Sequence, residues 1–457
     1  MDACIFKQYD IRGVYGEQLK EEDAWRIGYA TAQVLPTFVT DRRGELPRPQ
    51  SVCVGRDMRT HGRVLENALI EGIRSAGMDV IDVGMIDTPQ VYFAINYLGT
   101  CGGVQVTASH NPVEYNGFKI SGPEAIPIGA DNGLQEIKRL ALALSRAEGT
   151  ATGHLEQQDL VPEYRKHVLQ FLAPTVTRKK VAIDASNGTA GKVVPLIFDG
   201  APIEILRINF EHTGKFVHDP DPLKERNLAQ LKAAVREEKC DFGLCLDGDA
   251  DRLVMVDEKG DTVTSDLLMA LLVPRFLEQQ PKSVIVYNLC SSRVVAEEIA
   301  KYGGTPRRER VGHVFMKKTM RESHAVFGGE PSGHFYYRDN YYADSAMITV
   351  AHVLNAVSEA DVPVSELIRP LRRYSRAQEL NFRVENKQRK MEELARRYSK
   401  GQIDYLDGVT VSFEDWWFNC RPSNTEPLLR LNLEAKTADL LQEKLAEMEQ
   451  MLGKPVA

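Results

Sequence analysis

The stretch from Val104 to Ile120 reads VQVTASHNPVEYNGFKI, and the rest of the chain is organised around it. Apolar residues alternate at its start, as they do at the end of a strand, and a loop of small and hydrogen-bonding residues follows. The Asn-Gly pair is a turn signal, and a short second strand ends the stretch. The pattern predicts a hairpin that carries Ser109 on a turn and returns Lys119 close to it. The alternative is a surface hairpin whose polar side chains only cap turns.

Length and composition narrow the function classes. The 457 residues exceed one hydrophobic core and suggest roughly three domains, with four allowed. The 57 basic and 64 acidic residues give a net charge of −7, which argues against a nucleic-acid or membrane-surface partner. The seven cysteines include no Cys-x-x-Cys pair, which favours reduced thiols in the cytoplasm and argues against a zinc site. No export signal is expected, because the N-terminus MDACIFKQYDIRG has no basic-then-apolar pattern. No membrane span is expected, because the most apolar run, near Leu267 to Val273, is cut by Pro274.

A strand, helix, strand pattern occurs three times, over residues 51–83, 180–206 and 283–306. The pattern predicts three similar α/β domains, each with a mainly parallel sheet covered by helices. The chain after about Ser375 has a different order, with a helix, several strands and a final helix. This order predicts a small α+β domain.

Three carboxylates recur at every second residue in FGLCLDGDADRLVMVD, residues 242–257. Asp247, Asp249 and Asp251 lie on a turn between two apolar strands, where like charges repel one another. A hard cation bound through oxygen atoms, best matched by Mg²⁺ with a ligand position left for phosphate, removes this repulsion. A solvated acidic turn is the alternative, and a calcium EF-hand loop fails because Arg252 stands where that loop needs glycine.

The loop GGEPSGH, residues 328–334, brings together a carboxylate, a hydroxyl and an imidazole. Glu330, Ser332 and His334 could bind the vicinal hydroxyls of a sugar, or they could cap the loop and fill space. A basic cluster precedes them, of which His313 is a candidate substrate ligand and for which a solvated helix face is the alternative. The cluster comprises Arg307, Arg308, Arg310, His313, Lys317 and Lys318.

The segment CRPSNTEP, residues 420–427, has the groups that a phosphate needs. Arg421 offers a fork of charged donors, and Ser423, Asn424 and Thr425 offer neutral ones. A turn between two strands, held by its own side chains, is the alternative.

Four motifs together resemble the α-D-phosphohexomutases: TASHNP at 107–112, DGDADR at 247–252, GEPSGH at 329–334 and RPSNTEP at 421–427. The opening YDIRG at 9–13 is similar to the phosphomannomutase/phosphoglucomutase branch. The resemblance implies an α/β fold of four domains in a heart shape around one cleft. Three domains would be similar α/β domains with mixed sheets, and the fourth a C-terminal α+β domain. We expect a phosphoserine loop in 1–148, a metal-binding loop in 149–256, a sugar-binding loop in 257–370 and phosphate binding in 371–457.

The resemblance also implies a role for each motif residue. Ser109 would carry a phosphoryl group and would bind Mg²⁺ together with Asp247, Asp249 and Asp251. Arg252 would contact the same phosphoryl group, and Lys119 and His334 would transfer protons. The expected substrate ligands are Tyr9, Arg12, His313, Glu330, Ser332, His334, Arg421, Ser423, Asn424 and Thr425.

The reaction implied is reversible transfer of phosphate between O6 and O1 of mannose and glucose phosphates. It would pass through a phosphoserine enzyme and a hexose 1,6-bisphosphate. A phosphoglucosamine mutase, a phosphosugar phosphatase and a non-catalytic phosphosugar sensor are the alternatives. We expect a cytoplasmic protein, monomeric or weakly dimeric, whose partners are small hexose phosphates.

Two positions depart from the family pattern. The strand end at 288–290 reads Asn-Leu-Cys where this branch usually has a basic residue, so the resemblance implies that sugar contact only if Arg293 replaces the basic residue. Pro331 stands where Met is more usual, which would stiffen the loop.

Overall fold

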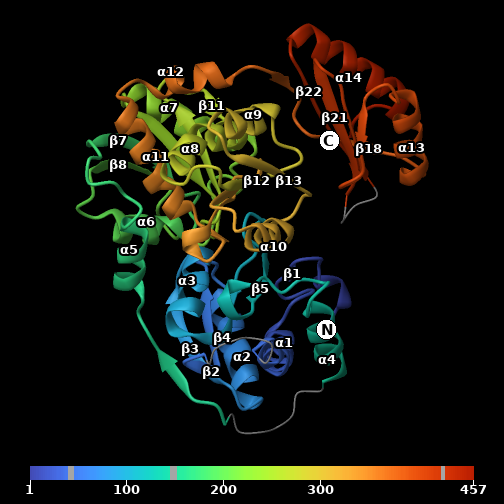
Figure 1. Cartoon of the computed structure of the whole chain (residues 1–457). Coiled ribbons are helices and arrows are strands. Elements are labelled where there is room, and N and C mark those ends of the chain that lie inside the picture. The colour runs from blue at the N-terminus through green and yellow to red at the C-terminus, as the bar shows by residue number, and fades with distance from the viewer. Residues whose placement is uncertain (40–45, 145–151, 424–427, 457) are drawn as a thin grey trace. The chain divides into compact units, whose positions relative to one another are not determined.

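The structure is a computed structural model that describes residues 1–39, 46–144, 152–423 and 428–456 (Figure 1). The chain forms two compact units. The first comprises Met1–Val263 and Ser332–Ser365, and the second comprises Thr264–Pro331 and Glu366–Ala457.

The first sheet of unit one is mixed. Its strand order is β1-β5-β4-β2-β3-β6, in which β4, β2, β3 and β6 run parallel and β5 and β1 are antiparallel additions. The strands are β1 (Ile11–Val14), β2 (Arg48–Arg56), β3 (Asp79–Met85), β4 (Thr100–Val106), β5 (Tyr115–Ser121) and β6 (Leu155–Gln157).

Helices cover both faces of this sheet (Figure 1). One buried cluster joins α1 (Glu21–Val34), α2 (Gly62–Ser75) and α4 (Leu134–Ala143) to the sheet, and a second joins α3 (Thr88–Leu98) to the opposite face. Asp87 starts α3 because its side chain accepts a hydrogen bond from the backbone N–H of Gln90. Short 3₁₀ helices are η1 (Ala3–Ile5), η2 (Leu35–Phe38) and η3 (Pro123–Ala125).

The second sheet of unit one has the order β11-β10-β9-β7-β8. Strands β9, β7 and β8 are parallel, and β9 turns back antiparallel into β10. The loop that carries Asp247, Asp249 and Asp251, called the acidic loop below, lies on this turn at the carboxyl end of β9. The strands are β7 (Lys179–Asp184), β8 (Ile203–Ile208), β9 (Phe242–Leu246), β10 (Leu253–Asp257) and β11 (Thr262–Val263), with helices α5 (Val161–Leu169), α6 (Ala190–Phe198), η4 (Glu225–Leu228) and α7 (Ala229–Glu237).

Unit one also contains the antiparallel pair β15 (Phe335–Tyr337) and β16 (Ala343–Asp344), with η5 (Arg338–Asn340) between them and the buried helix α11 (Ala346–Ala360) after them. The short α12 (Val364–Ile368) and η6 (Arg369–Leu371) follow where the chain leaves this unit.

Unit two begins with three parallel strands in the order β13-β12-β14. Their elements are α8 (Ser265–Gln279), β12 (Val284–Asn288), α9 (Arg293–Lys301), β13 (Thr305–Glu309), α10 (His313–Ser323) and β14 (Phe327–Gly329).

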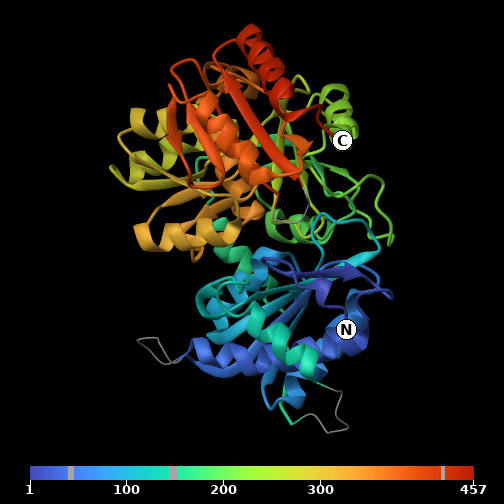
Figure 2. The same cartoon turned by 90° about the vertical axis from the view of Figure 1, so that its right-hand side faces the viewer.

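The C-terminal part of unit two is an antiparallel sheet with α14 packed against it (Figure 2). Its order is β17-β22-β21-β20-β19, and β18 also pairs with β22. The elements are β17 (Ser375–Arg376), β18 (Leu380–Arg383), α13 (Lys387–Arg397), β19 (Gln402–Asp404), β20 (Val409–Ser412), β21 (Trp416–Pro422), β22 (Leu428–Ala435) and α14 (Ala438–Leu452).

The α/β class, the mixed sheets and the closing α+β part are confirmed, but one local prediction is wrong. The Asn-Gly pair at 116–117 lies inside β5 rather than in a turn, and β5 begins at Tyr115. Gly117 pairs with Arg12 of β1, and a Cβ on Gly117 would lie 1.9 Å from the carbonyl oxygen of Ile11. The glycine therefore permits close strand contact instead of a turn.

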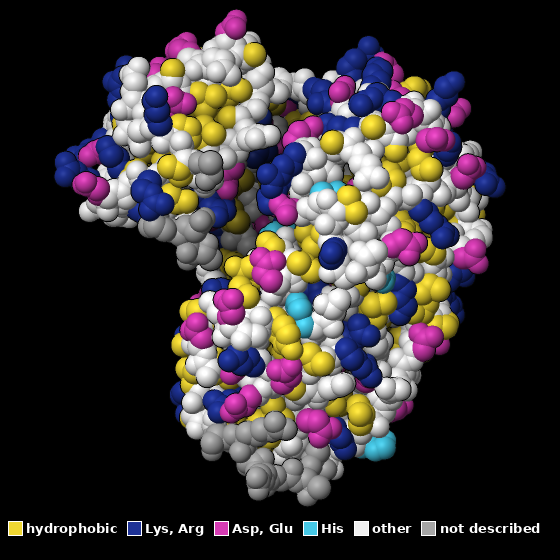
Figure 3. Space-filling view, turned by 180° about the vertical axis from the view of Figure 1, so that it is seen from behind, with side chains coloured by type: hydrophobic (Ala, Val, Ile, Leu, Met, Phe, Trp, Pro, Cys, Tyr) yellow, Lys and Arg dark blue, Asp and Glu magenta, His cyan; other side chains and the backbone are white. Residues whose placement is uncertain are grey.

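The surface agrees with the balanced composition. Acidic and basic side chains are intermingled on the face shown in Figure 3, without a large patch of one sign. Among the helices of the described ranges, none has the length and apolar content needed to cross a bilayer.

Candidate functional site

Ser109 lies in the loop that follows β4, and its backbone is left-handed, with φ of 50°. Its N–H donates to Thr107 Oγ1 over 2.9 Å, and Thr107 Oγ1 in turn donates to the buried Asp57 Oδ2 over 2.7 Å. Left-handed backbone at serine costs on the order of 1 kcal/mol or more, so surrounding contacts must hold it.

Arg59 supplies these contacts. Its guanidinium is buried and donates to the backbone carbonyls of Ser109, Asn111, Pro112 and Tyr115 over 2.9, 2.7, 2.6 and 2.9 Å. Its Nε also faces Asp57 Oδ2 at 3.2 Å. One fixed fork of donors therefore sets the course of the whole loop.

The acidic loop directly contacts the loop that carries Ser109, called the serine loop below. Ser109 Oγ donates to Asp247 Oδ2 over 2.9 Å, although the two residues lie 138 positions apart. A Cβ on Gly248 would lie 2.4 Å from the carbonyl oxygen of Ser109, so only glycine allows this approach. Asp249 is fixed from the other side by Thr88, whose Oγ1 donates to Asp249 Oδ2 over 2.6 Å.

The three carboxylates fit a cation. One oxygen from each of Asp247, Asp249 and Asp251 lies within 4.8 Å of the others, and all three side chains are buried. Burial, followed by the charges of Asp251 and Asp249, raises the pKa of Asp247 well above its ordinary value. Asp249 Oδ1 is buried and accepts no hydrogen bond from the described residues. An all-oxygen donor set with an unsatisfied buried acceptor suits a hard divalent metal ion.

Lys119 reaches this trio from β5. Its ammonium donates to Asp249 Oδ2 and Asp251 Oδ2 over 2.6 and 2.5 Å. Burial alone would lower the pKa of Lys119, but the charges of Asp249 and Asp251 outweigh it and raise the pKa above the ordinary value. The side chain is therefore a fixed positive charge in this arrangement.

Arg252 and two histidines complete the polar surroundings of Ser109. Arg252 Nε lies 3.8 Å from Asp247 Oδ2. His110 Nδ1 is 3.1 Å from Ser109 Oγ, and the charge of Arg252, together with burial, holds the pKa of His110 well below its ordinary value. His334 Nε2 lies 3.3 Å from Asp251 Oδ1, and its Nδ1 is 2.9 Å from Ser332 Oγ.

The YDIRG segment, residues 9–13, contacts the serine loop through Arg12. Arg12, on β1, donates to Asn111 Oδ1 in the serine loop over 2.5 Å and pairs with Asp10 at 2.7 Å. Tyr9 lies just before β1 and is half-buried. The structure thus brings Arg12 to the predicted loop.

Unit two contains the other part of GEPSGH. Glu330 is buried, and its Oε1 accepts from Asn288 Nδ2 over 2.8 Å and from the Gly312 N–H over 3.3 Å. His313 is the next residue and begins α10. The strand end at 288–290 therefore holds Glu330 through Asn288, while Leu289 is buried.

Arg293 does not replace the basic residue that related proteins usually have at the strand end 288–290. Its guanidinium donates to the backbone carbonyls of Phe413, Glu414 and Trp416 over 2.5, 2.7 and 3.1 Å. It thus joins α9 to the C-terminal sheet.

Arg421 lies next to the last residue of β21 and is buried, and its Nη2 donates to Glu379 Oε2 over 2.9 Å. The same carboxylate accepts from Arg430 and Asn432. Ser423 is buried beside this strand end, and its N–H donates to the carbonyl of Leu428. Asn424 and Thr425 lie outside the described residues.

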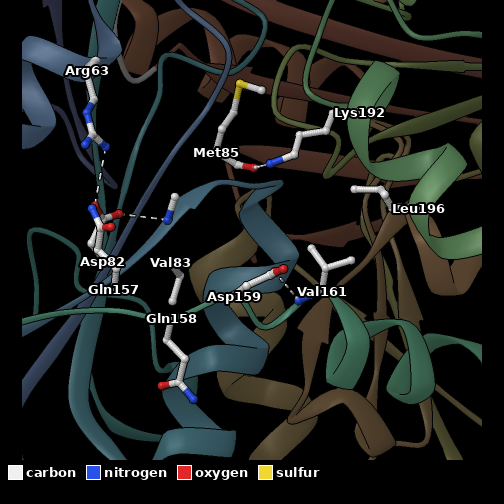
Figure 4. A pocket seen from close by; sticks show the side chains of 11 residues that line it. Arg63, Asp82, Val83, Met85, Gln157, Gln158, Asp159, Val161, Lys192 and Leu196 are labelled. Atoms are coloured by element: carbon white, nitrogen blue, oxygen red, sulfur yellow. Dashed lines mark hydrogen bonds and ion pairs between the residues drawn. The ribbon is translucent and has the colours of Figure 1, made fainter.

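A separate hollow opens elsewhere in unit one (Figure 4). Lys192 Nζ donates to the carbonyl of Met85 there, and Arg63 faces Asp82 at 3.5 Å. The predicted site residues are not among those that line it. Its charged groups are already paired within the chain.

Known proteins share this architecture over the whole chain. Four family models match, described as phosphoglucomutase/phosphomannomutase α/β/α domains I, II and III and the C-terminal domain, at residues 3–147, 162–260, 264–374 and 379–451. The phosphomannomutase of Vibrio cholerae is 37% identical over 99% of both chains. The chain belongs to the phosphoglucomutase/phosphomannomutase family. It is a phosphohexose mutase, an isomerase of carbohydrate metabolism.

Solved structures agree with the family assignment. A phosphoglucomutase/phosphomannomutase family protein from Burkholderia thailandensis superimposes with a TM-score of 0.89 at 31% identity, covering 99% of this chain and 97% of that one. An Aspergillus fumigatus N-acetylphosphoglucosamine mutase, solved with GlcNAc-6P and magnesium, has a TM-score of 0.55 at 15% identity, covering 80% and 91%. The second likeness is one of fold alone.

Four contributors to the site were missed from the sequence. Asp57, Arg59 and Thr88 hold the serine and acidic loops, and His110 contacts Ser109 Oγ. His110 lies inside the quoted TASHNP motif and could have been proposed. The other three lie at strand or helix ends far from the motifs, where sequence gives no sign of their partners.

Proposed function

We propose that Ser109 carries a phosphoryl group and passes it to a hydroxyl of a hexose phosphate, so that phosphate moves between O6 and O1. One observation carries the proposal: Ser109 Oγ lies 2.9 Å from Asp247 Oδ2, and Ser109 has a left-handed backbone in a loop held by Arg59. A serine set beside three carboxylates that can hold a metal ion suits a phosphoryl donor, whose phosphoryl group the metal binds, rather than a free nucleophile.

The transfer balances without other reagents. The sugar oxygen forms a bond to phosphorus while the bond from phosphorus to Ser109 Oγ breaks, and the hydroxyl proton leaves. The product is a hexose 1,6-bisphosphate, whose other phosphoryl group then returns to Ser109. His334 would accept the proton of the sugar hydroxyl, and Lys119, held as an ammonium ion, would donate a proton to Ser109 Oγ as its bond to phosphorus breaks. Both proton transfers reverse when Ser109 is phosphorylated again.

Asp247, Asp249, Asp251 and Ser109 would hold Mg²⁺, which when bound supplies positive charge to a phosphoryl oxygen. Arg252 and Lys119 add fixed positive charge from the protein, which favours a transition state with charge spread over the phosphoryl oxygens. The carboxylate trio and the unsatisfied Asp249 Oδ1 support this assignment.

We assign the remaining motif residues to the substrate. Glu330, Ser332, His334 and His313 would bind sugar hydroxyls, Arg421, Ser423, Asn424 and Thr425 the phosphate that does not react, and Tyr9 and Arg12 the side next to Ser109. Mannose and glucose differ only at C2, and contacts to O3 and O4 would accept both sugars. The seven free cysteines support a reducing, cytoplasmic setting, and we propose a monomer or weak homodimer.

The test is a coupled assay with mannose 1-phosphate and glucose 1-phosphate, Mg²⁺ and a trace of the matching 1,6-bisphosphate. We expect turnover of both sugars, and no turnover by Ser109→Ala. Ser121→Ala is the matched control, because Ser121 is a buried serine of β5 outside the site.

Release of inorganic phosphate at the rate of sugar consumption would instead indicate the phosphatase. Turnover by Ser109→Ala close to that of the control would contradict the mechanism. If mannose and glucose phosphates are both inert while glucosamine phosphate reacts, the phosphoglucosamine alternative holds.

A further inference from the structure

A second group of side chains that can bind a metal lies beside the acidic trio of Asp247, Asp249 and Asp251. One ligand atom each of Asp251, His334 and Asp344 lies within 4.8 Å of the other two, and all three residues are buried in unit one. They come from three separate segments: the acidic loop, the GEPSGH motif and the end of β16. The fold, rather than the local sequence, brings them together.

The histidine is oriented as metal ligands usually are. His334 Nδ1 is 2.9 Å from Ser332 Oγ, and its Nε2 faces Asp251 Oδ1 at 3.3 Å. A hydroxyl can accept as well as donate, so Ser332 can stabilise the tautomer that carries its proton on Nδ1. In that tautomer Nε2 has a lone pair available for a metal bound between the ring and Asp251. A hydrogen bond to the other ring nitrogen commonly fixes a ligating histidine in this way.

The two carboxylate oxygens of Asp251 have different contacts. Oδ2 accepts from Lys119, on the side of the acidic trio. Oδ1 is buried and faces the His334 ring at 3.3 Å, and within the part of the chain that the structure describes it accepts no hydrogen bond of good geometry. A buried carboxylate oxygen in this state gains free energy from a cation.

We propose that Asp251, His334 and Asp344 form a second divalent-cation site, for a borderline metal such as zinc. Imidazole with two carboxylates suits Zn²⁺, whereas Mg²⁺ prefers oxygen ligands alone. Tetrahedral zinc ligands lie roughly 3.4 Å apart, given metal–ligand distances of about 2.1 Å. The His334–Asp251 pair already has this separation, and the Asp344 ligand atom lies within 4.8 Å of both. The predicted absence of a zinc site rested on cysteine spacing and did not consider this set.

The site has a functional consequence that rests on the proposed function. A metal bound to His334 Nε2 removes the proton acceptor, because it occupies the lone pair that would take the proton. No redox partner is needed. Zinc at this site would therefore inhibit the mutase while Mg²⁺ stays on the trio, and added Mg²⁺ would not reverse the inhibition.

Cobalt is the probe, because Co²⁺ replaces zinc and its visible absorption reports four-coordinate binding with a nitrogen ligand. The purified full chain is titrated with Co²⁺ in excess Mg²⁺. We expect one cobalt per chain with intense visible bands, and binding at least about tenfold weaker in Asp344→Asn. Asp82→Asn is the control, because Asp82 is also a buried aspartate of unit one but lies outside the cluster. It should bind like the wild type.

Cobalt binding that Mg²⁺ competes away, or that Asp344→Asn leaves unchanged, would place the metal on the acidic trio and overturn the proposal. Absence of binding to the wild type would also overturn it. If Asp344→Asn does not unfold cooperatively, His334→Gln replaces it and should abolish the bands. Because these readouts need no turnover, they separate the failure of this site from the failure of the proposed mechanism.

Discussion

At the scale of single residues, the loop around Ser109 depends on one guanidinium. Arg59 is exposed by only 2% and donates to four backbone carbonyls of residues 109–115. Lysine cannot replace this fork, because a single ammonium has three donors on one atom. We therefore assign Arg59 as a positioning residue for Ser109.

Arg59→Lys should lower kcat by roughly 10²-fold, because displacement of a reacting group by about 1 Å costs that much, and should change KM far less. Steady-state kinetics with saturating Mg²⁺ measure both. The control is Arg63→Lys, which changes a more exposed arginine of the same region. A kcat within twofold of the wild type would show that the loop holds its course without Arg59.

Arg421→Ala tests the phosphate-binding assignment. Loss of charged hydrogen bonds worth about 2 kcal/mol should weaken hexose-phosphate binding roughly 30-fold, with metal affinity unchanged. Titration calorimetry measures both affinities. Arg430→Ala is the matched control, because Arg430 contacts the same Glu379 from outside the motif. Equal losses of sugar and metal affinity, or equal effects of the two variants, would count against the assignment.

Residue types were predictable where chemistry is concentrated in one motif. Asp247, Asp249 and Asp251 predict a bound cation because their negative charges repel one another. In the structure, one oxygen of each lies within 4.8 Å of the other two. Asp57, Arg59 and Thr88 act on loops 50 or more positions away, so nothing near them in sequence indicates their partners.

At the scale of elements, the site occupies strand ends. The loops after β4 and β9 both lie at the carboxyl ends of strands in parallel portions of their sheets, where polar loops commonly gather. The strands themselves were predictable from their apolar runs. The extent of β5 was not, because Gly117 was interpreted as a turn residue when it permits contact with β1.

Helix α2 contains a carboxyl that should make stability depend on pH. Glu66 is fully buried beside Arg56 and Arg63, and burial, with the charge of Asp82, raises its pKa to about 7 from 4.5. The folded state therefore binds a proton that the unfolded state loses between these two values. Stability falls as pH rises through this window, by at most about 3 kcal/mol.

Urea unfolding of the wild type and of Glu66→Gln, measured at pH 5 and pH 8, checks this prediction. The neutral amide should abolish most of the difference between the two pH values. Glu71→Gln is the control, because Glu71 lies on the same helix with its side chain about half exposed. A wild-type stability that rises from pH 5 to pH 8 would contradict the assigned pKa.

At the scale of the whole molecule, the four motifs are distributed over two compact units. The first contains Ser109, the acidic trio, Lys119 and His334, and the second contains Glu330 and Arg421. The order of motifs and the α/β pattern predicted the family and fold class. The domain boundaries remain a prediction, although the four family models match ranges close to them. Choice of sugar does not follow from the sequence, because mannose and glucose phosphates present the same donors and acceptors away from C2.

The central claim is that Ser109 is the phosphoryl carrier, and mass spectrometry of the protein tests it most directly. The purified enzyme is incubated with a hexose 1,6-bisphosphate and Mg²⁺, weighed intact and mapped by peptides. We expect one added phosphate, located on Ser109 and lost when hexose monophosphate is then added in excess. An active enzyme that shows no phosphate, or carries it stably on another residue, would contradict the account.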